Sequence, residues 1–176
     1  MLKVWQKNSY PDRRFVKKML WFTLVCILCT WLFFELIAQH FGIWIDTRGK
    51  RCIAQYSTYL VHKRNFSIQK GDIVAFNTHA AVTHYPLKSK FGKYVAATAG
   101  DKVVISAQGV FVNQELVATG FALTKKLNLD EISLYQQFVV AKNQWFVLGD
   151  SSDSYDSRYW GTIDSNQILG KAVPLW

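Results

Sequence analysis

Cysteine and histidine are scarce in this sequence, and neither occurs in a pattern that binds metals. The chain has three cysteines and four histidines in 176 residues. None of His40, His62, His79 and His84 has metal-ligand spacing to another histidine, a cysteine or an acid. We therefore predict neither a metal site nor a cofactor. No spacing selects a Ser-His-Asp triad either.

Acidic residues are also few, yet the excess of positive charge does not indicate nucleic-acid binding. The chain holds 21 lysines and arginines against 12 acidic residues, a net charge of +9. Residues 1–18 contain six of the basic residues and one acidic residue, so this segment alone carries +5. The other basic residues are scattered, whereas a nucleic-acid footprint gathers them on one face. We therefore predict no nucleic-acid partner.

Charge is absent from Met19 to Phe34, and the apolar run continues to Ala38 with Glu35 as its one charged residue. This length approaches the ~20 residues needed to cross a lipid bilayer. The run is longer than the apolar core of a cleaved signal peptide, and it is rich in Trp and Phe. We therefore predict an uncleaved transmembrane helix over residues 19–38.

The basic segment 1–18 predicts the orientation of that helix. Lysine and arginine beside a membrane span favour the cytoplasmic side. We expect residues 1–18 to be a cytoplasmic arm, so that the chain from about residue 40 lies outside. In a bacterium with two membranes, this is a single-pass inner-membrane protein with a cytoplasmic N-terminus and a periplasmic domain.

The three cysteines fall into two groups. Cys26 and Cys29 lie inside the apolar span, where we interpret them as small packing residues. Cys52 stands alone in the outer part of the chain. A thiol without an intramolecular partner in an oxidising compartment is a candidate reactive group.

The outer part of the chain has the pattern of a mainly β domain. No helix-period pattern of ten residues follows residue 40, and turn signals recur every 8–12 residues. We predict a linker over residues 39–51 and one β domain over 52–176, with hairpins at 102–112 and 138–148. Residues 118–137 fit either a loop or a short helix. The expected strands are 56–61, 72–76, 93–97, 102–106, 110–112, 115–117, 138–140, 144–148 and 168–173.

Lys93 begins one of these apolar strands. Burial disfavours the charged form of an amine, and a neutral amine can act as a general base. The alternative interpretation is an edge-strand lysine that extends its amine into solvent.

A polar segment bounded by glycines follows the expected strand 144–148. Residues 149–161 are rich in Asp and Ser, which favour turns, and this composition alone fits a solvated surface loop. Arg158 lies close to Asp156 and is followed by Tyr159 and Trp160. A loop that pairs charges and packs aromatic rings within itself is typical of a segment with a defined shape.

Together these features resemble the type I signal peptidases. Lys93 followed by Gly100-Asp101 is similar to the box that bears the general base of that family. Residues 149–161, with the string Asp-Ser-Arg-Tyr-Trp-Gly at 156–161, resemble its last box, and the segments 70–76 and 171–176 resemble its core strands. The short last box looks most like the branch that serves plasmid conjugation and processes pilin-type precursors.

The resemblance implies a signal-peptidase-like β domain and a serine/lysine dyad. Such an enzyme cleaves leader peptides from exported or pilin-type precursors through an acyl-enzyme, with Lys93 as general base. Cys52 occupies the place of the serine, with Ala54 where the family has proline and Lys50 where some members have a hydroxyl. Ser57 is the alternative nucleophile. A thiolate is the stronger nucleophile of the two side-chain types.

The resemblance also assigns supporting residues. Asp156 is expected to pair with Arg158, and either Ser154 or Ser157 to contact the Lys93 amine; Asp150 belongs to the same box. The precursor would lie extended and add a strand to an exposed sheet edge. The competing hypothesis is a catalytically inactive subunit of an envelope or conjugation complex.

Overall fold

The computed structural model describes residues 12–47 and 51–176, in two compact units that divide after Gln39. Most of the predicted basic arm, residues 1–11, and the predicted position of Lys50 lie outside the described residues.

The first unit is dominated by helix α1 (Arg13–His40), whose 28 residues contain neither proline nor glycine. It is long and apolar enough to cross a membrane, judged by length and composition. The hydroxyl of Thr30 donates to the carbonyl of Cys26 within the helix, so this polar group is satisfied internally. The predicted span 19–38 is helical throughout, and the helix begins earlier than predicted, at Arg13.

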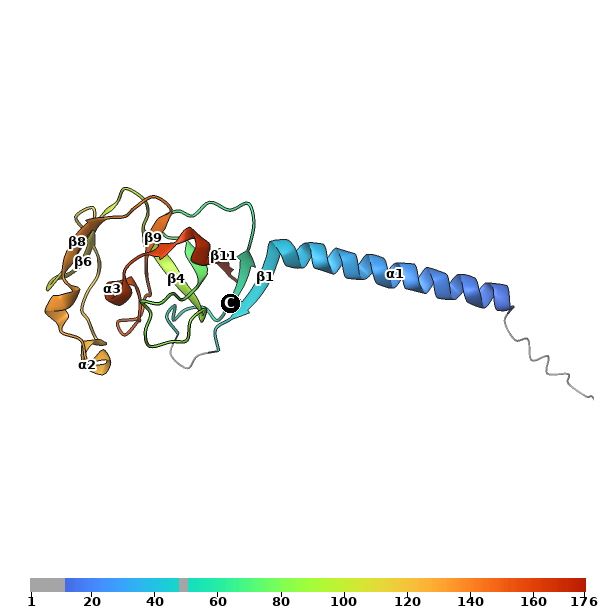
Figure 1. Cartoon of the computed structure of the whole chain (residues 1–176), viewed down its shortest axis with the longest axis horizontal. Helices are drawn as coiled ribbons and strands as arrows, with labels where there is room; N and C mark the ends of the chain where they lie inside the picture. Colours follow the sequence, from blue (N-terminus) through green and yellow to red (C-terminus); the bar gives the residue numbers. More distant parts are fainter. Residues whose placement is uncertain (1–11, 48–50) are drawn as a thin grey trace, which may run out of the picture. The chain divides into compact units, whose positions relative to one another are not determined.

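The second unit contains two antiparallel sheets (Figure 1), and the predicted mainly β fold is confirmed. The larger sheet has seven strands in the order β1-β2-β11-β3-β4-β9-β10. Its strands are β1 (Phe41–Ile45), β2 (Thr58–His62), β3 (Ile73–Asn77), β4 (Lys90–Ala97), β9 (Gln144–Leu148), β10 (Ile163–Asp164) and β11 (Ile168–Pro174).

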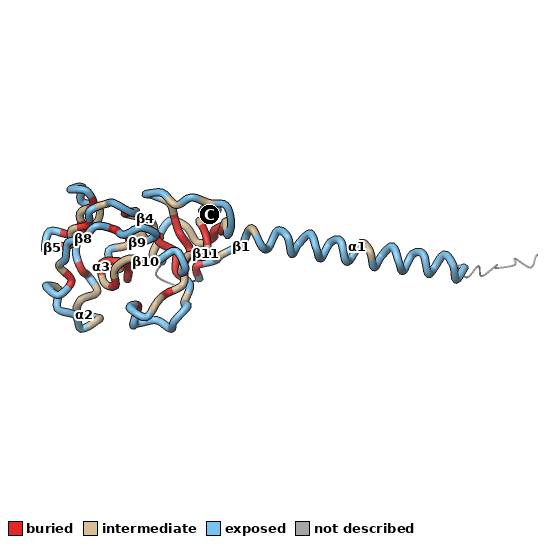
Figure 2. The backbone as a smooth tube through the Cα atoms, turned by 45° about the horizontal axis from the view of Figure 1, so that its top comes forward, coloured by how far each residue is buried: buried red, intermediate tan, exposed pale blue. Residues whose placement is uncertain are grey.

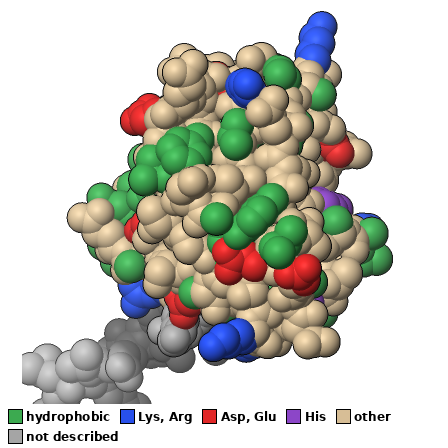
Figure 3. Space-filling view, turned by 90° about the vertical axis from the view of Figure 1, so that its left-hand side faces the viewer, with side chains coloured by type: hydrophobic (Ala, Val, Ile, Leu, Met, Phe, Trp, Pro, Cys, Tyr) green, Lys and Arg blue, Asp and Glu red, His purple; other side chains and the backbone are tan. Residues whose placement is uncertain are grey.

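The smaller sheet has four strands in the order β7-β6-β5-β8. Figure 3 views the domain from the side on which β6 and β8 lie in Figure 1. On that face, groups of apolar side chains lie among charged ones. The strands are β5 (Lys102–Ser106), β6 (Gly109–Val112), β7 (Glu115–Ala118) and β8 (Gln136–Val139). The connecting helices are short: α2 (Thr124–Leu127), η1 (Glu131–Leu134), α3 (Ser157–Trp160) and η2 (Ser165–Gln167).

Two predictions about this domain are wrong. Part of the expected linker 39–51 is strand β1, because Phe41–Ile45 pairs antiparallel with β2 and stacks Trp44 on Tyr59. The expected hairpin 138–148 does not form, since β8 pairs with β5 and β9 pairs with β4 and β10. A short turn signal could not reveal that its flanking strands belong to different sheets.

Strand β4 runs through the buried part of the domain (Figure 2). Phe91 and Val95 join an apolar cluster with Val74, Phe76 and residues of the 149–161 loop. Lys93 lies between them on the same strand, and its side chain is completely buried. The fold therefore buries an ionisable amine beside an apolar cluster.

Candidate active site

Lys93 lies in β4 next to the point where a second neighbouring strand, β9, begins to pair with it. Its Cα pairs with Val74 of β3, and the ladder between β4 and β9 begins one residue later, at Tyr94. The Lys93 Nζ donates a hydrogen bond of 2.6 Å to the Oγ of Ser154 and lies 5.8 Å from the centroid of the Phe91 ring. No carboxylate among the described residues forms a salt bridge with this amine.

Asp156 organises the loop that brings Ser154 to the lysine. Its carboxylate caps α3 by accepting from the backbone N–H of Arg158, and it also accepts from the N–H of Gly149 at 3.0 Å. The Arg158 guanidinium donates to both carboxylate oxygens, at 2.8 and 2.9 Å, so the predicted ion pair is present. Burial lowers the pKa of Arg158, but the hydrogen bonds and charge of Asp156 outweigh this and raise it.

The two serines that the sequence left open have different partners. Ser154 accepts from Lys93, whereas the Oγ of Ser157 accepts from the backbone N–H of Val147 at 2.9 Å. Both side chains are buried. Ser157 therefore ties the loop to β9, and Ser154 contacts the lysine.

Cys52 lies against the same loop through its backbone. The N–H of Asp150 donates to the Cys52 carbonyl at 3.0 Å, and the Asp150 carboxylate accepts from the N–H of Ala54. Gly149 makes the contact possible, because a Cβ there would lie 2.2 Å from the Ser154 Oγ and 2.7 Å from the Cys52 carbonyl oxygen. The Cys52 carbonyl and the Ser154 hydroxyl, which accepts from Lys93, therefore both lie against Gly149.

Ser57, the alternative nucleophile, lies elsewhere. Its Oγ donates to the carbonyl of Trp176 at 3.3 Å, and its backbone N–H donates to the same oxygen at 2.8 Å. It does not line the pocket that contains Cys52.

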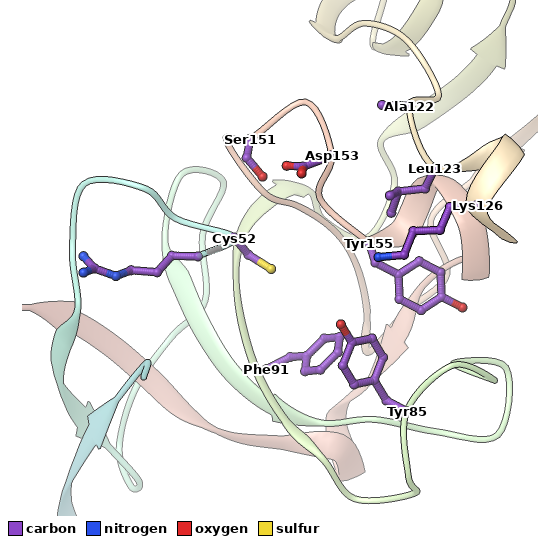
Figure 4. A pocket seen from close by; sticks show the side chains of 10 residues that line it. Cys52, Tyr85, Phe91, Ala122, Leu123, Lys126, Ser151, Asp153 and Tyr155 are labelled. Carbon is purple, nitrogen blue, oxygen red and sulfur yellow. The ribbon is translucent and has the colours of Figure 1, made fainter. Parts of the chain in front are cut away.

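That pocket is a cavity of about 390 Å³ (Figure 4). The Cys52 sulfur points into it, and the Tyr85, Phe91 and Tyr155 rings lie on another side. Burial raises the pKa of Tyr155, more than its hydrogen bonds to Thr83 lower it, so its hydroxyl stays protonated. The complete lining is Arg51, Cys52, Tyr85, Phe91, Ala122, Leu123, Lys126, Ser151, Asp153 and Tyr155.

Sequence reasoning missed the residues that reach this pocket from long connections. Tyr85 comes from the segment between β3 and β4, and Leu123 and Lys126 come from the ambiguous segment 118–137. No local pattern marked them, because only the tertiary fold carries them to Cys52. No group of three or more His, Cys, Asp or Glu side chains in the described parts of the chain could hold a metal ion.

Comparisons with known proteins all identify the same family. A model described as signal peptidase, peptidase S26, matches residues 14–176. The probable signal peptidase I-2 of Synechocystis is 31% identical over 110 residues, which cover 61% of this chain and 48% of that protein. The thylakoidal processing peptidase 1 of Arabidopsis thaliana is 29% identical over 132 residues, covering 72% of this chain and 36% of that protein.

Among solved structures, a signal peptidase I from Enterococcus faecalis matches with a TM-score of 0.40 and 21% identity over 61% of this chain and 98% of that one. The matched region spans about half of the cyanobacterial relative and about a third of the plant one.

Proposed function

Because the chain belongs to the signal peptidase family S26, we propose that it is a membrane-anchored endopeptidase that removes leader peptides from exported or pilin-type precursors. The observation that carries the proposal is a fully buried lysine amine, hydrogen-bonded to a serine hydroxyl, beside a pocket that a thiol enters. We assign catalysis to Lys93 and Cys52, with Ser154 as a positioning residue.

Lys93 is the proposed general base. Its amine is completely buried, and a serine hydroxyl rather than a carboxylate is its hydrogen-bond partner among the described residues. The Ser154 hydroxyl accepts one hydrogen bond from this amine and orients its lone pair.

Cys52 is the proposed nucleophile. Lys93 takes the thiol proton as the sulfur attacks the scissile carbonyl, and the new ammonium gives that proton to the departing amine. A water molecule then attacks the thioester and gives a proton to Lys93. The carbon–sulfur bond breaks, the Cys52 sulfur takes that proton back from Lys93, and the leader is released with a free carboxylate. The backbone N–H of Cys52 is the proposed oxyanion donor.

The sheet supports an extended substrate. β3 flanks Lys90–Lys93 on one side of β4, while β9 flanks the strand only from Tyr94 onward. A precursor laid beside residues 90–93 would continue the sheet toward Cys52 and would be held by backbone hydrogen bonds. Its cleavable bond would then pass through the pocket.

Helix α1 supports a membrane anchor by its length and composition. We propose that it crosses the inner membrane once, with the basic N-terminal residues in the cytoplasm and the β domain in the periplasm. A role in conjugative transfer, with pilin precursors as substrates, is proposed from the short last box at 149–161.

N-terminal proteomics of the cell envelope tests this function. In cells whose own gene copy is replaced, Lys93→Ala should make one or more precursors retain their leaders, while the variant remains folded. An unchanged set of N-termini would favour the inactive-subunit hypothesis. Leu129→Ala, an exposed position remote from Lys93 in the chain, is the matched control.

The nucleophile has its own test. Cys52→Ser should retain part of the leader removal, because a hydroxyl can replace the thiol, and Cys52→Ala should abolish it. Ser57→Ala should remain active. Full activity of Cys52→Ala with loss of activity in Ser57→Ala would transfer the role to Ser57.

A further inference from the structure

One wall of the Cys52 pocket comes from the segment before α2 and from α2 itself. Ala122, Leu123 and Lys126 line the cavity from this side. In Figure 4 they lie across the pocket from Cys52, and the Lys126 amine is turned toward the cavity. A precursor bound at Cys52 in this pocket would face this wall.

The wall is held by the same box that braces Lys93. The Arg158 guanidinium donates to the carbonyl of Gly120 at 3.1 Å, and the backbone N–H of Leu123 donates to the Tyr159 hydroxyl at 3.2 Å. Phe121 is buried, with its ring centroid 6.5 Å from that of Tyr159. Lys126 is therefore carried on a segment with a defined position.

Lys126 is the charged residue of this wall, and Arg51 and Asp153 also line the pocket. Beside Lys126, the pocket is lined by the apolar Leu123 and by the rings of Tyr85, Phe91 and Tyr155. Asp153, which also lines the pocket, is not a free carboxylate. A cation at the mouth of a partly apolar pocket attracts a carboxylate more strongly than it would in open water.

We propose that Lys126 is a specificity-determining residue that selects an acidic side chain in the precursor close to the cleaved bond. The proposal rests on the proposed function and adds the chemistry of the substrate to it. Precursors with a basic residue at that position are expected to be poor substrates.

The chain provides a matched control for this residue. Lys125 precedes Lys126 in α2, is exposed, and does not line the pocket. Lys125→Glu and Lys126→Glu change the net charge equally, so they have the same long-range electrostatic effect. A difference between them reports the local position of the Lys126 amine.

Alkylation of Cys52 tests the local charge without requiring proteolysis. In the full chain with Cys26→Ala and Cys29→Ala, the Cys52 sulfur displaces iodide from anionic iodoacetate or from neutral iodoacetamide. Lys126→Glu should lower the ratio of the iodoacetate rate to the iodoacetamide rate about threefold to tenfold, and Lys125→Glu should change it by less than about 1.5-fold. Equal effects of the two variants would overturn the proposal. Lys126→Gln should give an intermediate ratio, which keeps the test valid if Lys126→Glu unfolds.

Cleavage then tests the substrate preference. Internally quenched alanine-rich peptides carry Glu, Gln or Lys in turn at each of three positions on either side of the cleaved bond. At one position Glu should raise kcat/KM about threefold over Gln, and Lys126→Glu should reverse the order of Glu and Lys there. Cleavage with no charge preference overturns the specificity alone. Absence of all cleavage, with the alkylation difference intact, contradicts the proposed function but not the cationic wall.

Discussion

The Lys93 amine and the Ser154 hydroxyl are joined by a 2.6 Å hydrogen bond in the interior of the domain, although 61 residues separate them in the chain. Ser154 is held in place by the Asp156–Arg158 ion pair of its own loop, and Lys93 by the strand β4. The orientation of the amine therefore depends on a loop that takes no part in the proposed covalent chemistry.

Replacing Ser154 by Ala should lower kcat about 10- to 100-fold, because the buried Lys93 amine loses the hydroxyl that accepts its hydrogen bond. KM should change little, since Ser154 does not line the pocket. Ser152→Ala in the same loop is the control, because Ser152 is exposed. Peptide-cleavage kinetics would contradict the positioning role if both variants behaved alike.

Gly149→Ala should inactivate the protein or reduce its stability. The added methyl group would meet the Ser154 Oγ and the Cys52 carbonyl at distances that real Cβ atoms do not adopt, so the two loops must separate. Gly42→Ala is the comparison, because its methyl group would meet only the flexible end of Lys63. Reactivity of Cys52 toward iodoacetamide and thermal unfolding should change in the first variant and not in the second.

Removing one partner of the buried ion pair should be strongly destabilising. Asp156→Ala leaves the Arg158 guanidinium uncompensated in the interior, and we expect a loss of about 3–5 kcal/mol in the free energy of unfolding. Lys171→Met breaks the more exposed pair with Asp72 and should cost about 1 kcal/mol or less. Urea denaturation of both variants measures the difference, and similar losses would contradict this account.

Stability should fall as the pH drops below about 6.5. Burial lowers the pKa of His79 below its ordinary value, more than the charge of Asp164 and the Thr162 carbonyl raise it. The unfolded chain therefore binds a proton first, and stability is lost from the ordinary pKa down through the lowered one. Protonation also removes the acceptor at Nδ1 that the N–H of Ala81 uses.

Urea midpoints at pH 8, 6.5 and 5 measure this effect. His79→Asn should weaken the dependence on pH in that range, whereas His62→Asn should retain it. A wild-type midpoint that does not fall between pH 6.5 and 5 would rule out the assigned role of His79.

The sequence predicted those parts of the fold whose pattern is local. Short apolar runs and turn signals were sufficient for β5 and β9, and the long apolar run for the body of α1. β1 was missed because Phe41–Ile45 is short and contains Gly42, which suits a linker. Its strand character depends on pairing with β2, which no local signal encodes.

The candidate active site was also only partly predictable from the sequence. The Asp156–Arg158 pair could be predicted because both residues belong to one short turn. The choice between Ser154 and Ser157 could not, because it depends on how Asp156 caps α3 and turns the loop. Lys126 and Tyr85 escaped prediction because long connections bring them to Cys52.

Strand β11 lies between β2 and β3, although it follows both by about a hundred residues in the chain. During synthesis on the ribosome, β2 and β3 must therefore wait with open edges until residues 168–174 emerge. Contacts this distant in sequence slow folding. We expect nascent chains that stop before Ile168 to remain sensitive to added protease, because β2 and β3 cannot be joined into one sheet before β11 has been made.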